Sequence, residues 1–143
     1  ELSDSDILSL STSFKNRGIV EINYWDFKIN FPFLLHGVAS AEILIDKLDI
    51  IESDILKAII NHTTGGTDLD ELSKLTFICD FCEPKRKYKE AKMVRDILAE
   101  SNNLNRAYLA TYKYILQDLL DRELKICPES IDGYNEAHIS KIY

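Results

Sequence analysis

Residues that interrupt helices are scarce in this sequence. It has five glycines and three prolines among 143 residues, too few for a collagen-like, linker-rich or disordered chain. Long hydrophobic runs are also missing, since none approaches the roughly 18 residues that a membrane-spanning helix needs. Because roughly 100–200 residues make one domain, we expect residues 1–143 to form a single globular domain.

Positive charge is in the minority. Seventeen lysines and arginines stand against 24 aspartates and glutamates, which gives a formal net charge of −7. Such a chain repels the phosphates of nucleic acids and the anionic surface of membranes. We therefore expect neither nucleic acid nor a membrane as a general binding partner.

Cysteine is also rare, with only Cys79, Cys82 and Cys127. An odd number of cysteines without a preceding signal peptide favours a reducing, cytoplasmic location. Cys79 and Cys82 form a C-x-x-C motif, but its redox interpretation requires a βαβ context and a zinc site requires two more soft ligands. We interpret both as reduced, buried, small apolar residues on one helix that bind no metal.

The spacing of apolar residues predicts an all-α protein. Capping residues and helix-ending residues separate the apolar segments, with Ser3, Ser53 and Asp68 expected as N-caps. Residues 19–31 alternate between apolar and polar, but a single strand would have no partner, so we expect an apolar loop there. The predicted helices cover residues 3–16, 32–48, 53–64, 68–83, 89–100, 104–124 and 128–139.

A few polar residues within apolar segments are candidates for chemistry. His36 lies in an apolar helix, His62 ends another, and Asp80 lies in the almost wholly apolar stretch 75–82. A carboxylate there is costly to bury unless it is paired or bound to a metal. Each histidine alone is more often a hydrogen-bonded core or capping residue, and His138 is expected to be solvated. Together, nitrogen and oxygen donors from three helices could converge on iron, manganese, cobalt or zinc.

A basic run follows this apolar stretch and offers a second interpretation of Asp80. Lys85-Arg86-Lys87 stands out in an acidic chain, and Asp80 could simply pair with Lys85 or Arg86. The run is then either a solvated loop or a clamp for phosphate near Asp80. The turn Thr63-Thr64-Gly65-Gly66 is only weak evidence for phosphate binding by itself.

Three segments together resemble a known family. They are Leu35-His36-Gly37, residues 58–65 (AIINHTTG) and residues 79–86 (CDFCEPKR). They resemble the YqeK-type HD-domain hydrolases of bacteria, which cleave diadenosine tetraphosphate symmetrically into two ADP. The family motifs are LHG or WHAP, then AI-x-x-HTTGR, then ADYIEP-x-R. The resemblance covers roughly residues 30–135, and the spacing between the three segments also agrees.

The resemblance implies an all-α, HD-domain-like helical bundle with two metal ions, usually iron. Its ligand order is His, His-Asp, His, His, Asp, and the last three fall on His36, His62 and Asp80, the last also a catalytic residue. Gly66 stands where the family often has arginine, and the two motif cysteines replace alanine and isoleucine. The residues implied to bind substrate are Thr63, Thr64, Gly65, Lys85 and Arg86.

The first three ligands of the family have no counterpart in this chain. Residues 1–4 (ELSD) resemble the segment that follows the family's His-Asp pair. We therefore expect the domain to be incomplete at its N-terminus, and we expect this piece alone to hydrolyse the dinucleotide very poorly.

The resemblance thus implies a cytoplasmic, metal-dependent hydrolase whose partner is a dinucleoside polyphosphate or another nucleotide, and it leaves a homodimer open. Two alternatives remain: a non-catalytic nucleotide-binding module that keeps the fold, and an HD phosphohydrolase acting on another nucleotide. If the metal interpretation is right, the side chains of His36, His62 and Asp80 should converge on one point.

Overall fold

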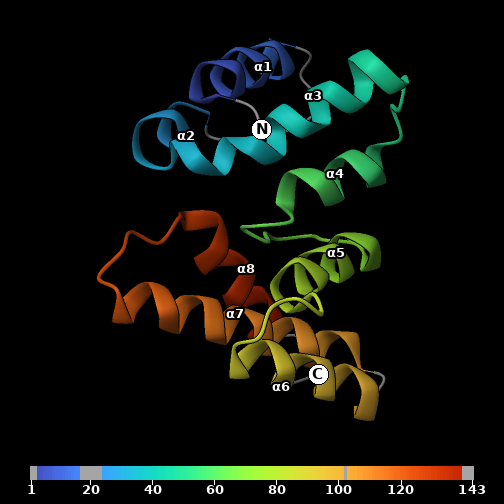
Figure 1. The fold of residues 1–143 in the computed structure, drawn as a ribbon, viewed down its shortest axis with the longest axis vertical. Coiled ribbons are helices and arrows are strands. Elements are labelled where there is room, and N and C mark those ends of the chain that lie inside the picture. The colour runs from blue at the N-terminus through green and yellow to red at the C-terminus, as the bar shows by residue number, and fades with distance from the viewer. Residues whose placement is uncertain (1–2, 17–23, 102, 140–143) are drawn as a thin grey trace.

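The computed structural model describes residues 3–16, 24–101 and 103–139, and every regular element in these ranges is a helix (Figure 1). The all-α prediction is therefore confirmed for the described part of the chain. The elements are α1 (Asp4–Asn16), α2 (Tyr24–Asn30), the 3₁₀ helix η1 (Pro32–Leu35), α3 (His36–Leu48), α4 (Ser53–Asn61), α5 (Glu71–Cys82), α6 (Lys89–Ser101), α7 (Leu104–Asp121) and α8 (Pro128–Ile139).

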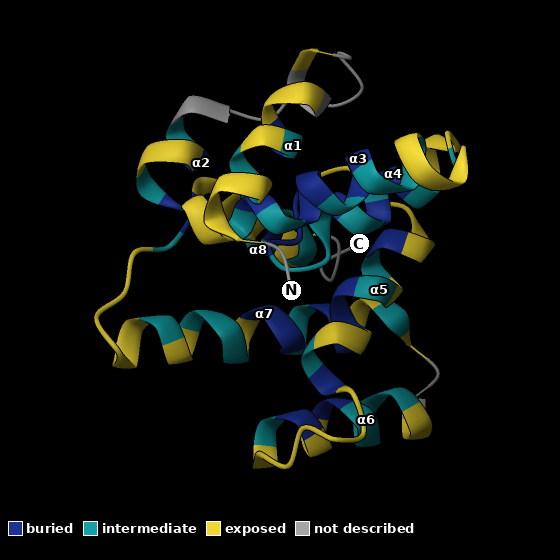
Figure 2. Ribbon diagram, turned by 45° about the horizontal axis from the view of Figure 1, so that its top comes forward, coloured by how far each residue is buried: buried dark blue, intermediate teal, exposed yellow. Residues whose placement is uncertain are grey.

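The helices gather in two groups, α1 to α4 and α5 to α8, each around its own buried residues (Figures 1 and 2). Leu35, Val38 and Leu56 are central to the first core. Phe77, Val94 and Tyr112 are central to the second. Helix α4 packs on α5 and joins the two groups. The turn between these helices, which carries His62 at its start, therefore lies at the seam of the two cores.

The N-terminus of α1 confirms one predicted cap. The backbone N–H of Ser3 donates to Asp6 Oδ2 over 3.1 Å, and the N–H of Asp6 donates to Ser3 Oγ over 3.3 Å. This reciprocal pair satisfies two N–H groups that the helix itself leaves free. The hydrogen bond from the Ser3 hydroxyl lowers the pKa of the Asp6 carboxyl.

Two other predicted caps are wrong. Ser53 is the first residue of α4, and Glu52 before it makes no side-chain capping bond. The cap of α5 is Asp70, which accepts a hydrogen bond from the Ser73 N–H over 2.7 Å, and not Asp68. Asp68 has a left-handed backbone (φ 56°), whereas an N-cap normally has the extended backbone that Asp70 shows.

The loop predicted for residues 19–31 is also wrong in its second half, because Tyr24–Asn30 forms α2. Residues 19–23 lie outside the described residues. Phe27 and Phe31 are both buried, with ring centroids 6.1 Å apart, and Asn30 donates to Asp26 over 2.6 Å. These i, i+4 contacts stabilise a helix. They were not recognised in the sequence because the apolar residues of this short stretch also alternate with polar ones.

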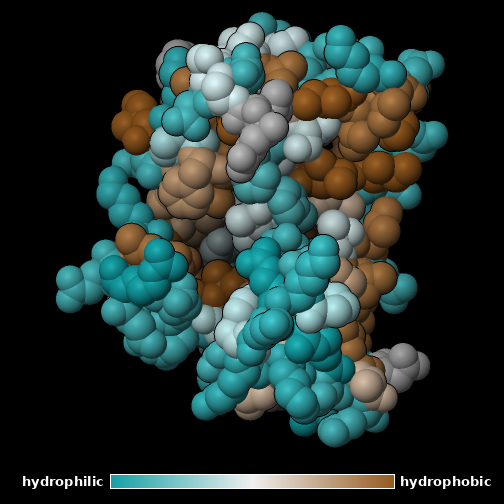
Figure 3. Space-filling model, in the orientation of Figure 1, coloured by the Kyte–Doolittle hydropathy of each residue, from teal (hydrophilic) through white to brown (hydrophobic). Residues whose placement is uncertain are grey.

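No helix in the described ranges is both long and apolar enough to cross a membrane. The space-filling view shows hydrophobic side chains over the ends of α3 and α4, while hydrophilic ones cover most of the α6 side of this face (Figure 3). Leu48 and Ile51, at the α3–α4 connection, are among the exposed hydrophobic residues.

Candidate metal and phosphate site

Two histidine rings meet where α3 begins and α4 ends. The Nε2 atoms of His36 and His62 are 2.9 Å apart, and the ring planes are inclined by 82°. His36 Nδ1 lies 2.7 Å from the Phe33 carbonyl, and His62 Nδ1 lies 2.6 Å from the Ile59 carbonyl. A carbonyl only accepts, so each Nδ1 carries the proton. Both Nε2 lone pairs consequently face each other.

A close contact between helices sets this distance. A Cβ atom on Gly37 would lie 2.7 Å from the Ile60 carbonyl oxygen and 3.0 Å from that of Ile59. Glycine is thus required for α3 to approach the backbone of α4 so closely. Because Gly37 follows His36, and Ile60 lies two residues before His62, the same contact brings the two rings together.

The paired histidines fit a metal ion. The two Nε2 atoms are 2.9 Å apart, close enough to act as ligands of one metal ion. Histidine nitrogens bind metals at about 2.0–2.1 Å, and two nitrogens that share one ion can be this far apart. Ligand histidines commonly donate their other ring N–H to a backbone carbonyl, as His36 and His62 do. The hydroxyl of Thr63 lies 3.2 Å from His36 Nε2.

Asp80 does not join the histidines. No cluster of three His, Cys, Asp or Glu side chains in the described ranges could hold a metal, so the predicted convergence of His36, His62 and Asp80 is not seen. Asp80 Oδ1 instead lies 3.6 Å from Arg86 Nη2, which is the alternative pairing considered from the sequence. Both side chains are more than two-fifths exposed, so the ion pair contributes little to stability and can exchange partners.

The apolar stretch around Asp80 misled the prediction because only one side of α5 is buried. Phe77, Ile78 and Cys82 are buried, whereas Leu75 and Cys79 are exposed. The prediction of a buried Cys79 is therefore wrong, and that of a buried Cys82 is confirmed. Both are free thiols, and burial raises the pKa of Cys82. His138 is exposed as expected.

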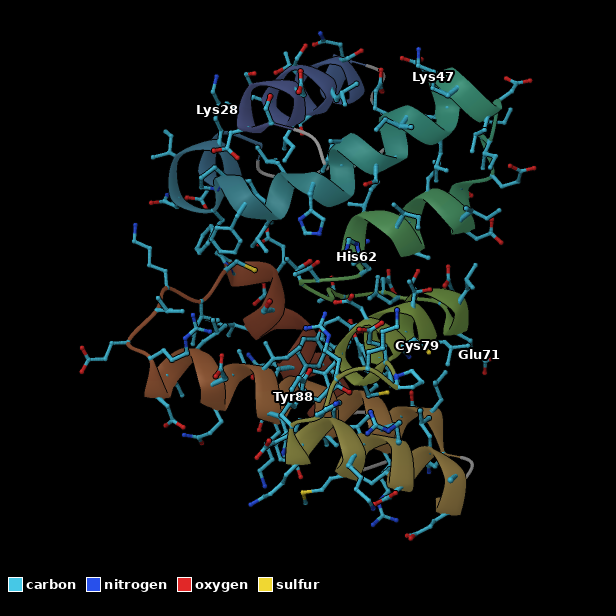
Figure 4. All side chains as sticks on the ribbon, in the orientation of Figure 1. Lys28, Lys47, His62, Glu71, Cys79 and Tyr88 are labelled. Carbon is cyan, nitrogen blue, oxygen red and sulfur yellow. The ribbon has the colours of Figure 1, made fainter. Side chains whose placement is uncertain are left out.

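One cavity nevertheless connects the candidate residues. It has a volume of about 850 Å³, and its walls include His62, Thr63, Asp80 and Arg86. Figure 4 shows His62 at the end of α4 that faces the second group of helices, and Tyr88 in the α5–α6 loop. The cavity therefore runs from His62 along α5 toward α6 and α7. Arg86 and Lys89 add positive charge to its wall.

Side chains of α7 and α8 form hydrogen bonds to the backbone of the turn after His62. Tyr112 Oη accepts a hydrogen bond from the Gly66 N–H over 2.8 Å, and Tyr108 Oη donates to the Gly66 carbonyl over 3.1 Å. Ser130 Oγ donates to the Thr64 carbonyl over 2.8 Å. Burial raises the pKa values of both tyrosines, so they stay protonated.

The predicted substrate-binding residues divide accordingly. Thr63 and Arg86 line the cavity. Thr64 and Gly65 are buried against α7 and α8 instead, and Lys85 is exposed but does not line the cavity. The sequence interpretation missed Tyr108 and Tyr112, although their i, i+4 spacing on a long apolar helix indicated a shared buried face.

Arg95 was also missed, although it supports the loop that carries Arg86. Its Nη1 lies 2.8 Å from the Cys82 carbonyl, 3.2 Å from that of Glu83 and 3.4 Å from that of Arg86. It thereby satisfies carbonyls that the end of α5 leaves free. The loop after Asp80 is consequently held in a defined shape.

Comparison with known proteins finds related sequences, although no protein-family model matches the chain. It is 30% identical over 103 residues to a symmetrical bis(5'-nucleosyl)-tetraphosphatase of Halalkalibacterium halodurans, covering 72% of this chain and 54% of that protein. A protein of the same name from Bacillus subtilis is 30% identical over 104 residues, covering 73% and 55%. The chain thus spans about half the length of the curated relatives it matches.

A solved structure matches nearly the whole chain. It is the crystal structure of a predicted HD superfamily hydrolase involved in NAD metabolism from Clostridium acetobutylicum. The TM-score is 0.81 at 28% sequence identity, and the match covers 98% of this chain and 69% of that one. The helical arrangement is therefore that of an HD-superfamily protein.

Proposed function

Because this chain belongs to the YqeK-type family of HD-domain hydrolases, we propose that it contributes to an enzyme that hydrolyses diadenosine tetraphosphate symmetrically into two ADP. The relatives from Halalkalibacterium halodurans and Bacillus subtilis are named for this reaction. The observation that carries the proposal is the His36–His62 pair, whose Nε2 atoms lie 2.9 Å apart, with His62 lining the same cavity as Arg86.

The proposed cofactor is a metal centre. Membership of the HD superfamily implies a divalent metal, and we propose a binuclear iron centre, with manganese, cobalt or zinc as substitutes. His36 and His62 would hold one ion, and Asp80 would help to hold the other. When bound, the ions supply an acidified water as nucleophile and neutralise phosphate charge.

The residues of this chain have separate roles in the proposal. The Phe33 and Ile59 carbonyls fix the two imidazoles through their Nδ1 protons. Arg86, which lies beside Asp80 and is well exposed, would turn to the phosphates and stabilise the negative charge that shifts between their oxygens. Thr63 is placed to donate its hydroxyl to a phosphate oxygen, since it lines the cavity next to the rings.

Product analysis tests the proposal. The full polypeptide that the gene encodes, supplied with Fe²⁺ or Mn²⁺, should convert diadenosine tetraphosphate to ADP alone on ion-exchange chromatography. Asp80→Asn and His62→Gln should each lower kcat at least about 100-fold, because removing one member of a cooperating site costs most of the catalytic effect. Asp96→Asn, which breaks a surface ion pair with Lys92, is the matched control and should keep full activity.

Other products would decide between the alternatives. ATP plus AMP would contradict symmetrical cleavage. Tight nucleotide binding without turnover would support a non-catalytic module, and faster turnover of another nucleotide would support a different HD phosphohydrolase. Metal analysis of His36→Ala, which should bind less metal than the unmodified chain, checks the metal site without relying on activity.

The location and assembly of the protein are further parts of the proposal. A cytoplasmic location is supported by Cys79, Cys82 and Cys127, which are all free thiols, as expected in a reducing compartment. Assembly into a homodimer stays a prediction that sedimentation velocity would check.

A further inference from the structure

The cavity has an aromatic wall that the hydrolytic chemistry does not use. Phe81, Tyr88, Tyr114 and Met93 line it, and we call these four residues the aromatic shelf. The rings of Phe81 and Tyr114 are nearly parallel, inclined by 7° with centroids 6.4 Å apart. Tyr88 meets Phe81 edge to face at 5.4 Å. The shelf therefore joins α5, the α5–α6 loop, α6 and α7.

Much of the shelf remains in contact with solvent. Tyr88 is 39% exposed and Met93 is 41% exposed, although both are large and apolar over most of their surface. Their polar atoms are already engaged within the shelf, because Tyr88 Oη donates to the Phe81 carbonyl over 2.5 Å and Tyr114 Oη lies 3.5 Å from Met93 Sδ. The hydroxyls thus hold the rings in place, and the exposed carbon surface of Tyr88 and Met93 is available to a ligand.

The surroundings of the shelf specify the ligand further. The cavity is lined by four cations and four carboxylates, namely Arg86, Lys89, Lys113, Arg122, Asp80, Glu90, Asp118 and Asp121. The shelf therefore lies among charges of both signs, and the exposed guanidinium of Arg86 is the cation beside Asp80. A flat aromatic group complements the shelf because bases stack on aromatic rings, and a phosphate tail can pair with the exposed Arg86. Phe81 directly follows Asp80 in α5, which places the shelf beside the proposed phosphate-binding residues. The volume of about 850 Å³ is ample for one nucleotide.

We propose that the aromatic shelf binds the purine base of one nucleoside of the substrate, with its phosphates extending toward Arg86 and His62. This inference rests on the proposed function and adds the subsite that selects a nucleotide over a bare polyphosphate. Tyr114 is then a specificity-determining residue, because it lines the cavity and takes no part in the proposed metal site.

The test compares two ligands that share phosphates and differ in the base. Binding of ADP and of inorganic pyrophosphate to this chain is measured by isothermal titration calorimetry with Mn²⁺ present. Tyr114→Leu should weaken ADP binding roughly tenfold, because the base loses an aromatic stacking partner, and should leave pyrophosphate binding unchanged. Tyr114→Phe keeps the ring and is the matched control, with ADP binding close to that of the unmodified chain.

A second variant covers a failure to fold. If circular dichroism shows that Tyr114→Leu is unfolded, Tyr88→Leu at the more exposed edge of the shelf provides the same comparison. Equal weakening of ADP and pyrophosphate binding, or unchanged ADP binding, overturns the inference.

Failure of the shelf is distinguishable from failure of the proposed function. If ADP binding depends on the shelf but the protein does not cleave diadenosine tetraphosphate, the proposed base subsite is supported and the proposed reaction is contradicted. If Tyr114→Leu cleaves the substrate symmetrically with an unchanged KM, the proposed reaction is supported and the proposed base subsite is contradicted.

Discussion

At the scale of single residues, the buried hydroxyls of Tyr108 and Tyr112 connect helix α7 to the turn after His62. The two oxygens are 2.8 Å apart, and both bond to the backbone of Gly66. The Tyr112 hydroxyl packs directly against the backbone of Gly133, where a Cβ atom would lie 2.0 Å from Tyr112 Oη. The tyrosine pair therefore fixes the turn from which Thr63 reaches the cavity.

Tyr112→Phe should lower the free energy of unfolding by about 1–3 kcal/mol, because the buried Gly66 N–H loses its acceptor. Urea denaturation followed by circular dichroism measures the change. Tyr114→Phe removes a hydroxyl that lies 3.5 Å from the Met93 sulfur, and should change stability by less than about 0.5 kcal/mol. Equal effects of the two substitutions would contradict a role for the Gly66 bond.

The same tyrosines make stability fall at alkaline pH. Burial raises the folded-state pKa of both Tyr108 and Tyr112 above that of an unfolded tyrosine. The stabilisation is complete below the unfolded pKa of about 10 and is lost as pH rises further, because the unfolded state then releases protons that the folded state keeps. Urea midpoints measured from pH 8 to pH 11 should decline above pH 10, and the decline should be shallower in Tyr112→Phe. A flat profile would show that the hydroxyls ionise freely in the folded protein.

The role of a residue was predictable from the sequence only where that residue belongs to a recognisable motif. His36 and His62 were singled out and do lie together, because their motifs place one at the start and one at the end of neighbouring helices. The separation of Asp80 from them was not predictable, since the sequence does not show which side of α5 faces solvent or that Arg86 returns to pair with Asp80. Tyr112 carries no recognisable motif, and its role depends on a turn 46 residues away.

At the scale of elements, the crossing of α3 and α4 determines the geometry of the histidine pair. Gly37 allows the helices to approach until its Cα lies against the Ile59 and Ile60 carbonyls. Most helices were predictable because apolar spacing and caps such as Ser3 agree along the chain. Errors arose where two candidate caps lie close together, as Asp68 and Asp70 do, because only the backbone conformation selects one of them.

Gly37→Ala should push α3 away from α4, since its Cβ would lie 2.7 Å from a backbone oxygen that cannot yield easily. Overpacking of this kind costs about 1–3 kcal/mol of stability, and the histidine rings should separate. We expect a lower urea midpoint together with weaker Mn²⁺ binding by calorimetry.

Ser40→Ala, one turn further along α3, is the control and should change neither quantity. Loss of stability in Gly37→Ala with unaltered Mn²⁺ binding would show that the helix crossing does not set the distance between the rings.

At the scale of the whole molecule, the cavity takes its walls from both groups of helices. His62 and Thr63 come directly after α4, the last helix of the first group. Asp80, Arg86 and the aromatic shelf lie in the second group of helices. The sequence predicted the helical class and the family, because motifs and periodicity are local. The division into two cores was not predictable, since it depends on which helices pack together.

Metal binding should stabilise the folded chain as a whole. Mn²⁺ at 100 times its Kd should raise the free energy of unfolding by about 2.7 kcal/mol, because only the folded state brings His36 and His62 together. Differential scanning fluorimetry should show a higher Tm with Mn²⁺ than without it, and His36→Ala should lose this increase. An equal increase in His36→Ala would place the ion at another site.

The position of His62 at the seam also affects how the protein would lose function on heating or in denaturant. The two groups have separate buried cores and meet at the α4–α5 contact and at the turn bonded to Tyr112 and Ser130. If these contacts were lost first, the groups would shift against each other while the helices persist. Such a slip would open the cavity between His62 and Arg86 with little change in helix content. Ligand affinity would then be the earliest and most sensitive reporter of damage, and a preparation with an intact helical spectrum could already be inactive.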